Sequence, residues 1–307
     1  MIAITCPGQG SQTPGFLSDW LELDVFRSEI EKSSEILEMD LIHFGTKADA
    51  EQIKDTRIAQ PLIVAASMAS YKVLVQELGE GVIFSGVAGH SVGEITAAHI
   101  SGILDAEASL KFVKARGEQM ARAAALAESS MAAVVGGDQE LVLAELEKLG
   151  LFAANYNGKG QIVAAGAASK IQELIHNPPS GTRVVGLAVA GAFHTSFMKS
   201  AKDELTSLAS SINTSNPDLI IWSNSDGSII ERGDDFLKLL VGQVSKPVRW
   251  DKTMDSMSAY GVTRIIELLP GGTLTGIAKR SMAGAQTLAL KSPEDLQKAV
   301  GFIREQG

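Results

Sequence analysis

The sequence has 307 residues, and its 45% of apolar and 21% of charged residues are typical of a globular protein with about two domains. A net charge of −9 argues against a general nucleic-acid-binding protein, and the single cysteine, Cys6, excludes an internal disulfide. The N-terminus lacks the pattern of a secretory signal, and no apolar run reaches the roughly 18 residues of a membrane span. We therefore expect a cytoplasmic protein.

Strands and helices are predicted to alternate in the first and last parts of the chain. Residues 2–6 (IAITC) have the composition of a strand that stops at Pro7-Gly8. Residues 58–79 carry apolar side chains three and four positions apart, which predicts a helix capped by Gly79. The further predicted strands are 82–88 and 263–269, and the further predicted helices are 92–103, 107–126 and 273–280. This alternation predicts an α/β-hydrolase-like domain with a parallel central sheet covered on both faces.

The middle of the chain has a different order of elements. Its predicted strands are 131–135, 151–156, 161–166 and 182–189, and its predicted helices are 138–150 and 168–176. The second and third strands are joined through Asn157-Gly158, a hairpin signal. This βαββαβ order is that of ferredoxin-like domains. We therefore expect a small ferredoxin-like α+β subdomain at residues 128–190, inserted into a large α/β catalytic domain formed by residues 1–127 and 191–307.

Ser91 lies in the stretch GHSVGE, between a predicted strand and a predicted helix. Gly-x-Ser-x-Gly at such a junction is the nucleophile-elbow pattern, in which Gly89 and Gly93 remove side chains that would collide in a sharp turn. Free N–H groups and the helix dipole at this N-terminus favour negative charge. The N–H of Val92 and one from the Gly-rich loop 7–12 could stabilise an oxyanion. The alternative is that Ser91 is only a turn or N-cap residue.

A serine nucleophile needs a base, and the chain has five histidines. His194 is the best candidate because it lies in the loop GAFHTSFM after the last strand of the predicted insert, and loops after strands are where sites are built. His90 is expected to orient the elbow by hydrogen bonding, whereas His99 is expected to pack or to lie at the surface. No Asp or Glu is nominated as a third triad member, and a backbone carbonyl could orient the imidazole instead. The alternative is that His194 is a core histidine.

Several motifs occur in order along the chain. They are PGQGSQ (7–12), QPLIVAA (60–66), GHSVGE (89–94), ARG (115–117), GAFHTSFM (191–198), QVSKPVRW (243–250) and PGGTLTGIAKR (270–280). In combination, these motifs resemble the malonyl-CoA:acyl carrier protein transacylases of fatty acid synthesis and the related acyltransferase domains of polyketide synthases. They are most similar to the actinobacterial stand-alone enzymes, and the resemblance covers essentially residues 1 to 290.

The resemblance implies a catalytic role for each of five residues. Ser91 matches the serine that is acylated by malonate, and His194 matches its base. Gln243 matches the residue whose backbone carbonyl orients the histidine, which would explain the missing acid. Gln9 and Val92 match the positions whose N–H groups form the oxyanion hole.

Four further matches concern the substrate. Arg116 matches the arginine that binds the free carboxylate of malonate, and a guanidinium can do so through two parallel charge-assisted hydrogen bonds. Phe193 matches an aromatic residue of malonyl-selective relatives and would crowd the α-methyl group of methylmalonyl. Asn155 and Asn224 match positions near the pocket and the histidine loop. From the residues alone, the better explanation of Arg116 is a solvated cation on a charged helix.

The implied activity is ping-pong transfer of malonyl from malonyl-CoA to the phosphopantetheine thiol of holo-acyl carrier protein, through a malonyl-serine, to supply extender units for fatty acid synthesis. No metal and no cofactor are expected, and we expect a monomer. Because carrier proteins are usually acidic, a local basic surface is expected, and its candidates are Lys170, Arg183, Lys279 and Arg280. The alternatives are a serine hydrolase such as a thioesterase, which would use the same elbow, and a non-catalytic module that binds carrier protein.

Overall fold

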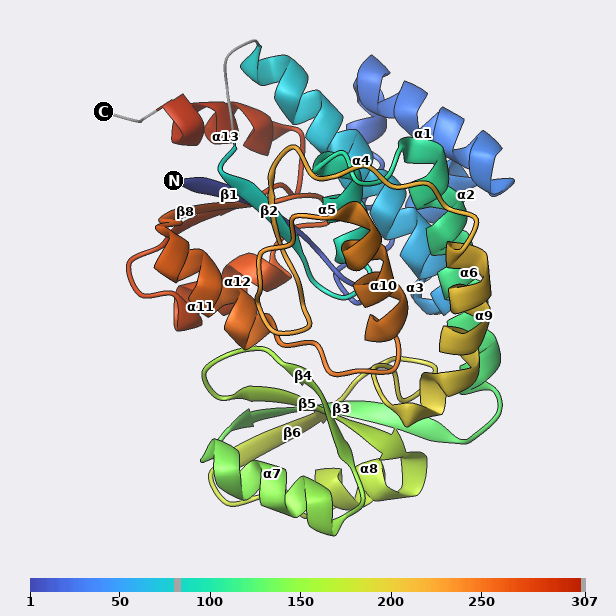
Figure 1. Cartoon of the computed structure of the whole chain (residues 1–307), viewed down its shortest axis with the longest axis vertical. Coiled ribbons are helices and arrows are strands. Elements are labelled where there is room, and N and C mark those ends of the chain that lie inside the picture. Colours follow the sequence, from blue (N-terminus) through green and yellow to red (C-terminus); the bar gives the residue numbers. More distant parts are fainter. Residues whose placement is uncertain (80–83, 305–307) are drawn as a thin grey trace.

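A five-stranded parallel sheet forms the centre of the larger part of the protein, as the computed structural model shows for residues 1–79 and 84–304 (Figure 1). Its strands are β1 (Ile2–Cys6), β2 (Gly86–Gly89), β7 (Ile220–Trp222), β8 (Arg264–Glu267) and β9 (Gln286–Ala289), in the order β7-β2-β1-β8-β9. The predicted parallel sheet is therefore confirmed. The strand predicted at 82–88 begins only at residue 86, and its residues 82 and 83 lie outside the described residues.

The register of this sheet brings the functional loops together. Cys6 at the end of β1 is paired with Gly89 at the end of β2, and Thr5 is paired with Glu267 at the end of β8. In a parallel sheet the carboxyl ends of the strands share one edge, which is where α/β proteins build their sites. The loop 7–12 and the Ser91 turn therefore emerge side by side.

Helices cover both faces of the central sheet. The helices of the larger part are α1 (Asp24–Leu37), α2 (Leu41–Thr46), α3 (Ala50–Lys54), α4 (Thr56–Leu78), α5 (Gly93–Ile100), α6 (Ala106–Ala124), α9 (Lys199–Ala209), α10 (Gly233–Gln243), α11 (Trp250–Tyr260), α12 (Thr273–Ser281) and α13 (Glu294–Arg304). Along β1 the side chains alternate: Ile2 and Ile4 join the core under α4, α5 and α6, whereas Ala3 joins the core under α11 and α12. The prediction of two covered faces is thus confirmed by the packing.

Helix α4 runs through the centre of the larger core. It is long and apolar enough to cross a membrane by length and composition, but 78% of its most apolar stretch is buried inside the protein, as expected of a core helix. Uninterrupted apolar runs within it are short because small polar residues break them. Two of these, Ser67 and Ser70, are buried and donate hydrogen bonds to the carbonyls of Leu269 and Ser67.

A second, antiparallel sheet lies beside the central sheet, at the bottom of Figure 1. Its strands are β3 (Ser129–Gly136), β4 (Phe152–Tyr156), β5 (Gln161–Ala167) and β6 (Thr182–Gly186), in the order β4-β5-β3-β6. Helices α7 (Gln139–Lys148) and α8 (Ala168–His176) cover one face and enclose a separate apolar core with it. The hairpin predicted at Asn157-Gly158 is present: β4 and β5 pair antiparallel, and the Asn157 N–H donates to the carbonyl of Gln161.

A buried carboxylate ties the end of β8 to the start of α12. Glu267 is fully buried and accepts hydrogen bonds from the backbone N–H groups of Gly272 (2.8 Å), Leu274 (2.9 Å) and Thr275 (2.8 Å). These are N–H groups that a helix N-terminus leaves without partners, and the negative charge also suits the helix dipole. Glu267 therefore holds one of the turns that border the functional edge of the sheet.

Replacing Glu267 with alanine should lower the free energy of unfolding by about 3 kcal/mol or more, because three N–H groups in a buried turn would lose their charged acceptor. The measurement is urea denaturation followed by circular dichroism. The control is Glu294→Ala, which removes an exposed carboxylate from the first turn of α13 and should cost less than about 0.5 kcal/mol. Equal losses in the two variants would show that the Glu267 carboxylate does not hold this turn.

Candidate active site

Ser91 lies at a strained turn between β2 and α5. Its φ is 54°, in the left-handed region that non-glycine residues rarely adopt. A Cβ atom on Gly89 would overlap the backbone of Gly93, and one on Gly93 would overlap the carbonyl of Cys6. Both positions therefore require glycine for the turn to close against β1. This is the nucleophile-elbow geometry that the sequence pattern predicts.

The backbone of the elbow is fixed by Asn224, which follows β7. The Asn224 Oδ1 accepts a hydrogen bond from the Ser91 N–H (2.7 Å), and its Nδ2 donates to the carbonyl of Gly89 (2.6 Å). Both polar atoms of this buried side chain are thus engaged with backbone. Asn224 lies at the site, as expected, but its contacts are those of a group that holds the serine turn.

His194 is positioned to act as the base for Ser91. Its Nε2 lies 2.7 Å from the Ser91 Oγ, and its Nδ1 lies 2.8 Å from the backbone carbonyl of Gln243. A carbonyl can only accept, so Nδ1 carries the proton and Nε2 is free to accept one from the serine. Burial, and then the charge of Arg116, lower the pKa of His194 to about 3, which keeps the imidazole neutral.

Arg116 lies inside the site and not in solvent. The side chain is on α6, it is 1% exposed, and its Nη2 is 3.4 Å from the Ser91 Oγ. Its Nη1 donates to the Gln60 Oε1 (2.6 Å), and its Nη2 donates to the Gln243 Oε1 (2.9 Å). Burial lowers the pKa of Arg116 to about 10, so it remains charged at neutral pH. The interpretation of Arg116 as a solvated cation is therefore wrong.

Two backbone N–H groups near the ends of β1 and β2 are unused. Among the residues that the structure describes, neither the Gln9 N–H nor the Val92 N–H donates a hydrogen bond, although Val92 is only 1% exposed. Gln9 follows β1 in the loop 7–12, and its side-chain Nε2 donates to the carbonyl of Lys54 (3.2 Å). Free N–H groups at the end of a strand and the start of a helix are suitable donors for an oxyanion.

No sequence pattern predicts a role at the site for two further polar residues, Glu94 and Gln60. Glu94, 1% exposed, accepts a hydrogen bond from the Asn224 N–H (2.6 Å) and another from the Gln243 Nε2. Burial raises the pKa of Glu94 to about 8. Gln60, also 1% exposed, contacts Arg116. An acid in the first helical turn is ordinarily explained by the helix dipole, and a glutamine in an apolar helix carries no signal, so the pattern alone could not assign either.

Three further residues singled out from the sequence are Phe193, Asn155 and His90. Phe193 is 6% exposed and directly precedes His194. Asn155 is in β4 opposite Val248, and its buried side-chain oxygen has no hydrogen-bond partner. His90 contacts the Oδ1 of Asn157 through its Nε2 (3.0 Å), so it links the elbow to the second sheet.

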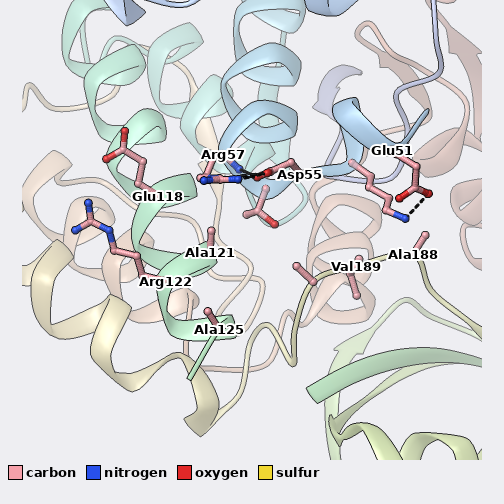
Figure 2. Close-up of a pocket in the computed structure, with 12 residues that line it drawn as sticks. Glu51, Asp55, Arg57, Glu118, Ala121, Arg122, Ala125, Ala188 and Val189 are labelled. Carbon is pink, nitrogen blue, oxygen red and sulfur yellow. Dashed lines mark hydrogen bonds and ion pairs between the residues drawn. The ribbon is translucent and has the colours of Figure 1, made fainter. Parts of the chain in front are cut away.

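A cavity of about 810 Å³ opens next to this cluster, between the α3–α4 corner, α6 and the segment 188–190 (Figure 2). Charged side chains of both signs line it, including Arg57, which pairs with Asp55, and Arg122. Its link to the cluster is Gln9, since the hydroxyl of Thr56, which lines the cavity, lies 3.5 Å from the Gln9 Nε2. Neither Ser91 nor His194 lines it.

Known proteins match almost the whole chain. The acyl transferase domain family matches residues 4–306. The malonyl CoA-acyl carrier protein transacylase of Mycobacterium tuberculosis is 44% identical over 302 residues, which are 97% of this chain and 99% of that protein. The crystal structure of MCAT from Mycobacterium tuberculosis has a TM-score of 0.93 at 43% identity, with 98% of this chain and 99% of that chain covered.

A further solved structure that matches this chain is a complex of two proteins. It contains a malonyl-transacylase bound to the acyl carrier protein of a type II polyketide synthase. The match has a TM-score of 0.92 at 29% identity, with 98% of this chain and 99% of that chain covered. Sequence and structure agree over nearly the full length in each case, and the family resemblance of the motifs is confirmed. The chain therefore belongs to the acyl transferase family, as one of its malonyl-CoA:acyl carrier protein transacylases.

Proposed function

We propose that the protein transfers the malonyl group from malonyl-CoA to the phosphopantetheine thiol of holo-acyl carrier protein, through a malonyl ester of Ser91. Membership of the malonyl-transacylase family supports the reaction class. The substrate class is inferred from the buried guanidinium of Arg116, whose Nη2 lies 3.4 Å from the Ser91 Oγ. The reaction supplies extender units for fatty acid synthesis.

In the first half-reaction, the Ser91 Oγ attacks the thioester carbonyl of malonyl-CoA while the His194 Nε2 takes the hydroxyl proton. The carbonyl oxygen becomes an oxyanion, to which the N–H groups of Gln9 and Val92 donate. The C–S bond then breaks, the proton on His194 passes to the sulfur of CoA, and the malonyl-serine ester remains. The Gln243 carbonyl holds the imidazole in the required tautomer throughout.

The second half-reaction uses the same groups in reverse order. His194 takes the proton of the phosphopantetheine thiol, whose sulfur attacks the ester carbonyl. The oxyanion forms in the same place, the C–O bond to Ser91 breaks, and the proton returns to the serine oxygen. Side chains and backbone N–H groups supply all the acid–base and charge stabilisation of this scheme, so the reaction as written needs no cofactor.

Arg116 is proposed to bind the far carboxylate of the malonyl group. Its guanidinium can offer two parallel N–H donors to a carboxylate, and its hydrogen-bonded neighbours Gln60 and Gln243 carry no net charge. An acetyl group would leave that charge buried without an anion, at a cost of about 1–3 kcal/mol or more. Phe193, buried beside the base, is proposed to disfavour a methyl branch at the α-carbon. Asn155, in β4, is proposed to contact the substrate.

The carrier arm of either substrate must reach Ser91 across the surface. We infer that it passes the cavity beside Gln9, because that cavity borders the loop that supplies an oxyanion donor. The proposed docking surface for an acidic carrier protein includes four exposed cations: Lys170, Arg183, Lys279 and Arg280. A monomeric, cytoplasmic enzyme suits this function.

We propose two structural units. Residues 1–127 and 191–307 would form the large α/β-hydrolase-like unit, and residues 128–190 a ferredoxin-like insert. The separate sheets and the separate core under α7 and α8 support this division. The strand order β4-β5-β3-β6 with antiparallel pairing supports the ferredoxin-like assignment.

A serine hydrolase would use the same elbow and base, and a non-catalytic carrier-binding module would need neither. Ser91 and His194 are within hydrogen-bonding distance, which favours catalysis over a module. Incubation with malonyl-CoA in the absence of carrier protein distinguishes the enzymes, because a hydrolase releases free malonate continuously. We expect one equivalent of CoA to be released and little malonate.

Ser91→Ala should abolish the malonyl adduct seen by intact-protein mass spectrometry after mixing with malonyl-CoA, because no hydroxyl remains to be acylated. The control is Ser210→Ala, which removes an exposed serine at the end of α9 and should leave the adduct at full yield. An adduct on the Ser91→Ala variant would refute the assignment of the nucleophile.

Arg116→Ala should lower the rate of Ser91 acylation by malonyl-CoA about 10- to 100-fold relative to acylation by acetyl-CoA, because only malonyl uses the guanidinium. Rapid-quench mass spectrometry with each acyl-CoA gives the two rates. Lys111→Ala, which removes an exposed cation from the same helix, serves as the control. An unchanged ratio in the Arg116 variant would show that this arginine does not bind the carboxylate.

The rate of Ser91 acylation should stay nearly constant between pH 7 and pH 5. The base must be neutral, and a pKa lowered to about 3 keeps His194 neutral at both values. An imidazole with the ordinary pKa of about 6.5 would instead lose more than tenfold in rate over the same range. The measurement is kcat/KM for malonyl-CoA against pH, and an acid limb near pH 6.5 would contradict the lowered pKa.

A further inference from the structure

Glu94 is a buried acidic residue that takes no part in the proposed reaction. Its carboxylate accepts the Asn224 N–H (2.6 Å) through Oε1 and the Gln243 Nε2 through Oε2. A buried carboxylate is costly, and it is retained where its hydrogen bonds set the position of something else. The group that it touches on the side of the substrate is the Gln243 amide.

Glu94 determines which way the Gln243 amide points. The pKa of Glu94 is about 8, so at pH 8.5 this group is mostly an ionised carboxylate, which can only accept hydrogen bonds and therefore requires the amide nitrogen to face it. The same nitrogen also donates to the backbone carbonyl of Ser91 (3.1 Å). The amide oxygen of Gln243 must then face the opposite way, where it accepts from the Arg116 Nη2 (2.9 Å).

The orientation of this amide matters to Arg116 because a guanidinium can only donate. If the Gln243 amide were reversed, its N–H groups would oppose the N–H groups of Arg116. The Arg116 Nη1 would then still donate to Gln60, but Nη2 would lose its acceptor and move away from the Gln243 amide. Nη2 is the nitrogen that lies 3.4 Å from the Ser91 Oγ, so this displacement would occur next to the acyl group.

We propose that Glu94 is a positioning residue for acyl selectivity: its carboxylate fixes the Gln243 amide, which in turn holds Arg116 where the malonyl carboxylate binds. This inference rests on the proposed function, because it assumes a malonyl-serine and an Arg116–carboxylate contact. It assigns no contact with the substrate to Glu94 itself. Acetyl transfer, which does not use the guanidinium, should depend on Glu94 much less.

The test is Glu94→Gln, which keeps the shape of the side chain and removes its acceptor-only character. The Asn224 N–H will still require the amide oxygen of the new glutamine, so the NH₂ group will face Gln243 and favour the reversed amide. The readout is the ratio of kcat/KM for Ser91 acylation by malonyl-CoA to that by acetyl-CoA, at pH 8.5. Both rates come from one preparation, so the ratio does not depend on the folded fraction.

We expect Glu94→Gln to lower this malonyl-to-acetyl ratio about five- to tenfold or more, through the malonyl rate. The matched control is Glu267→Gln, the same change at a buried carboxylate that accepts three backbone N–H groups outside the site. It should lower the melting temperature and leave the ratio unchanged. A conservative variant, Glu94→Asp, keeps an acceptor-only group and should keep the ratio within about twofold of the wild type.

Three outcomes separate the possibilities. If Glu94→Gln lowers both rates equally, Glu94 has a structural role only and the proposal is overturned. If Glu94→Asp lowers the ratio as much as Glu94→Gln does, the acceptor character is not what matters and the proposal also fails. If the wild-type protein forms no malonyl-serine, or if Arg116→Ala leaves the ratio unchanged, the proposed function itself fails, whatever the Glu94 variants do.

Discussion

The site depends on a guanidinium that is buried without a carboxylate bonded to it. The terminal nitrogens of Arg116 donate to the amide oxygens of Gln60 and Gln243, which satisfy hydrogen bonds but carry no net charge. In a buried environment a cation with no anion bonded to it is unfavourable, so an anion that binds it gains more there than it would in water. This arrangement suits the proposed acyl group, which carries its own carboxylate, and the fold supplies the stability that the buried cation costs.

The same cation would explain why the proposed base, His194, is held by a backbone carbonyl and not by an acid. A carboxylate in the place of the Gln243 carbonyl would lie beside His194 and close to Arg116. It would raise the pKa of the imidazole and would compete with the substrate for the guanidinium. The neutral carbonyl of Gln243 fixes the tautomer of His194 through a 2.8 Å contact. It neither raises the pKa of the imidazole nor competes for the guanidinium. A serine–histidine pair held by a carbonyl therefore suits the dicarboxylic substrate proposed for this site.

The parts of the protein that the sequence could predict are those specified by local patterns. The alternation of apolar runs and helical periodicity predicted the parallel sheet, and the elbow glycines predicted the Ser91 turn, because both are decided within a few neighbouring residues. Strand β7 has only three residues, and in the edge strand β9 buried and exposed side chains do not alternate. Neither strand therefore has a sequence pattern that predicts it. The contacts of Arg116 join α4, α6 and α10, and no local pattern contains a contact of that kind. The resemblance to a family, and not the spacing of residues, suggested its role.

The segment that joins α10 to α11 connects most of these features. Gln243 orients the imidazole and bonds to Arg116, and the carbonyl of Val244 accepts the N–H of His194. Four residues later, Val248 pairs with β4 of the second sheet, exchanging hydrogen bonds with Ala154 and Tyr156. The position of the second sheet and the geometry of the base are therefore set by one short stretch of backbone. A shift of that sheet relative to the central one would move the histidine and the arginine together, so the relative placement of the two sheets is itself a determinant of the site.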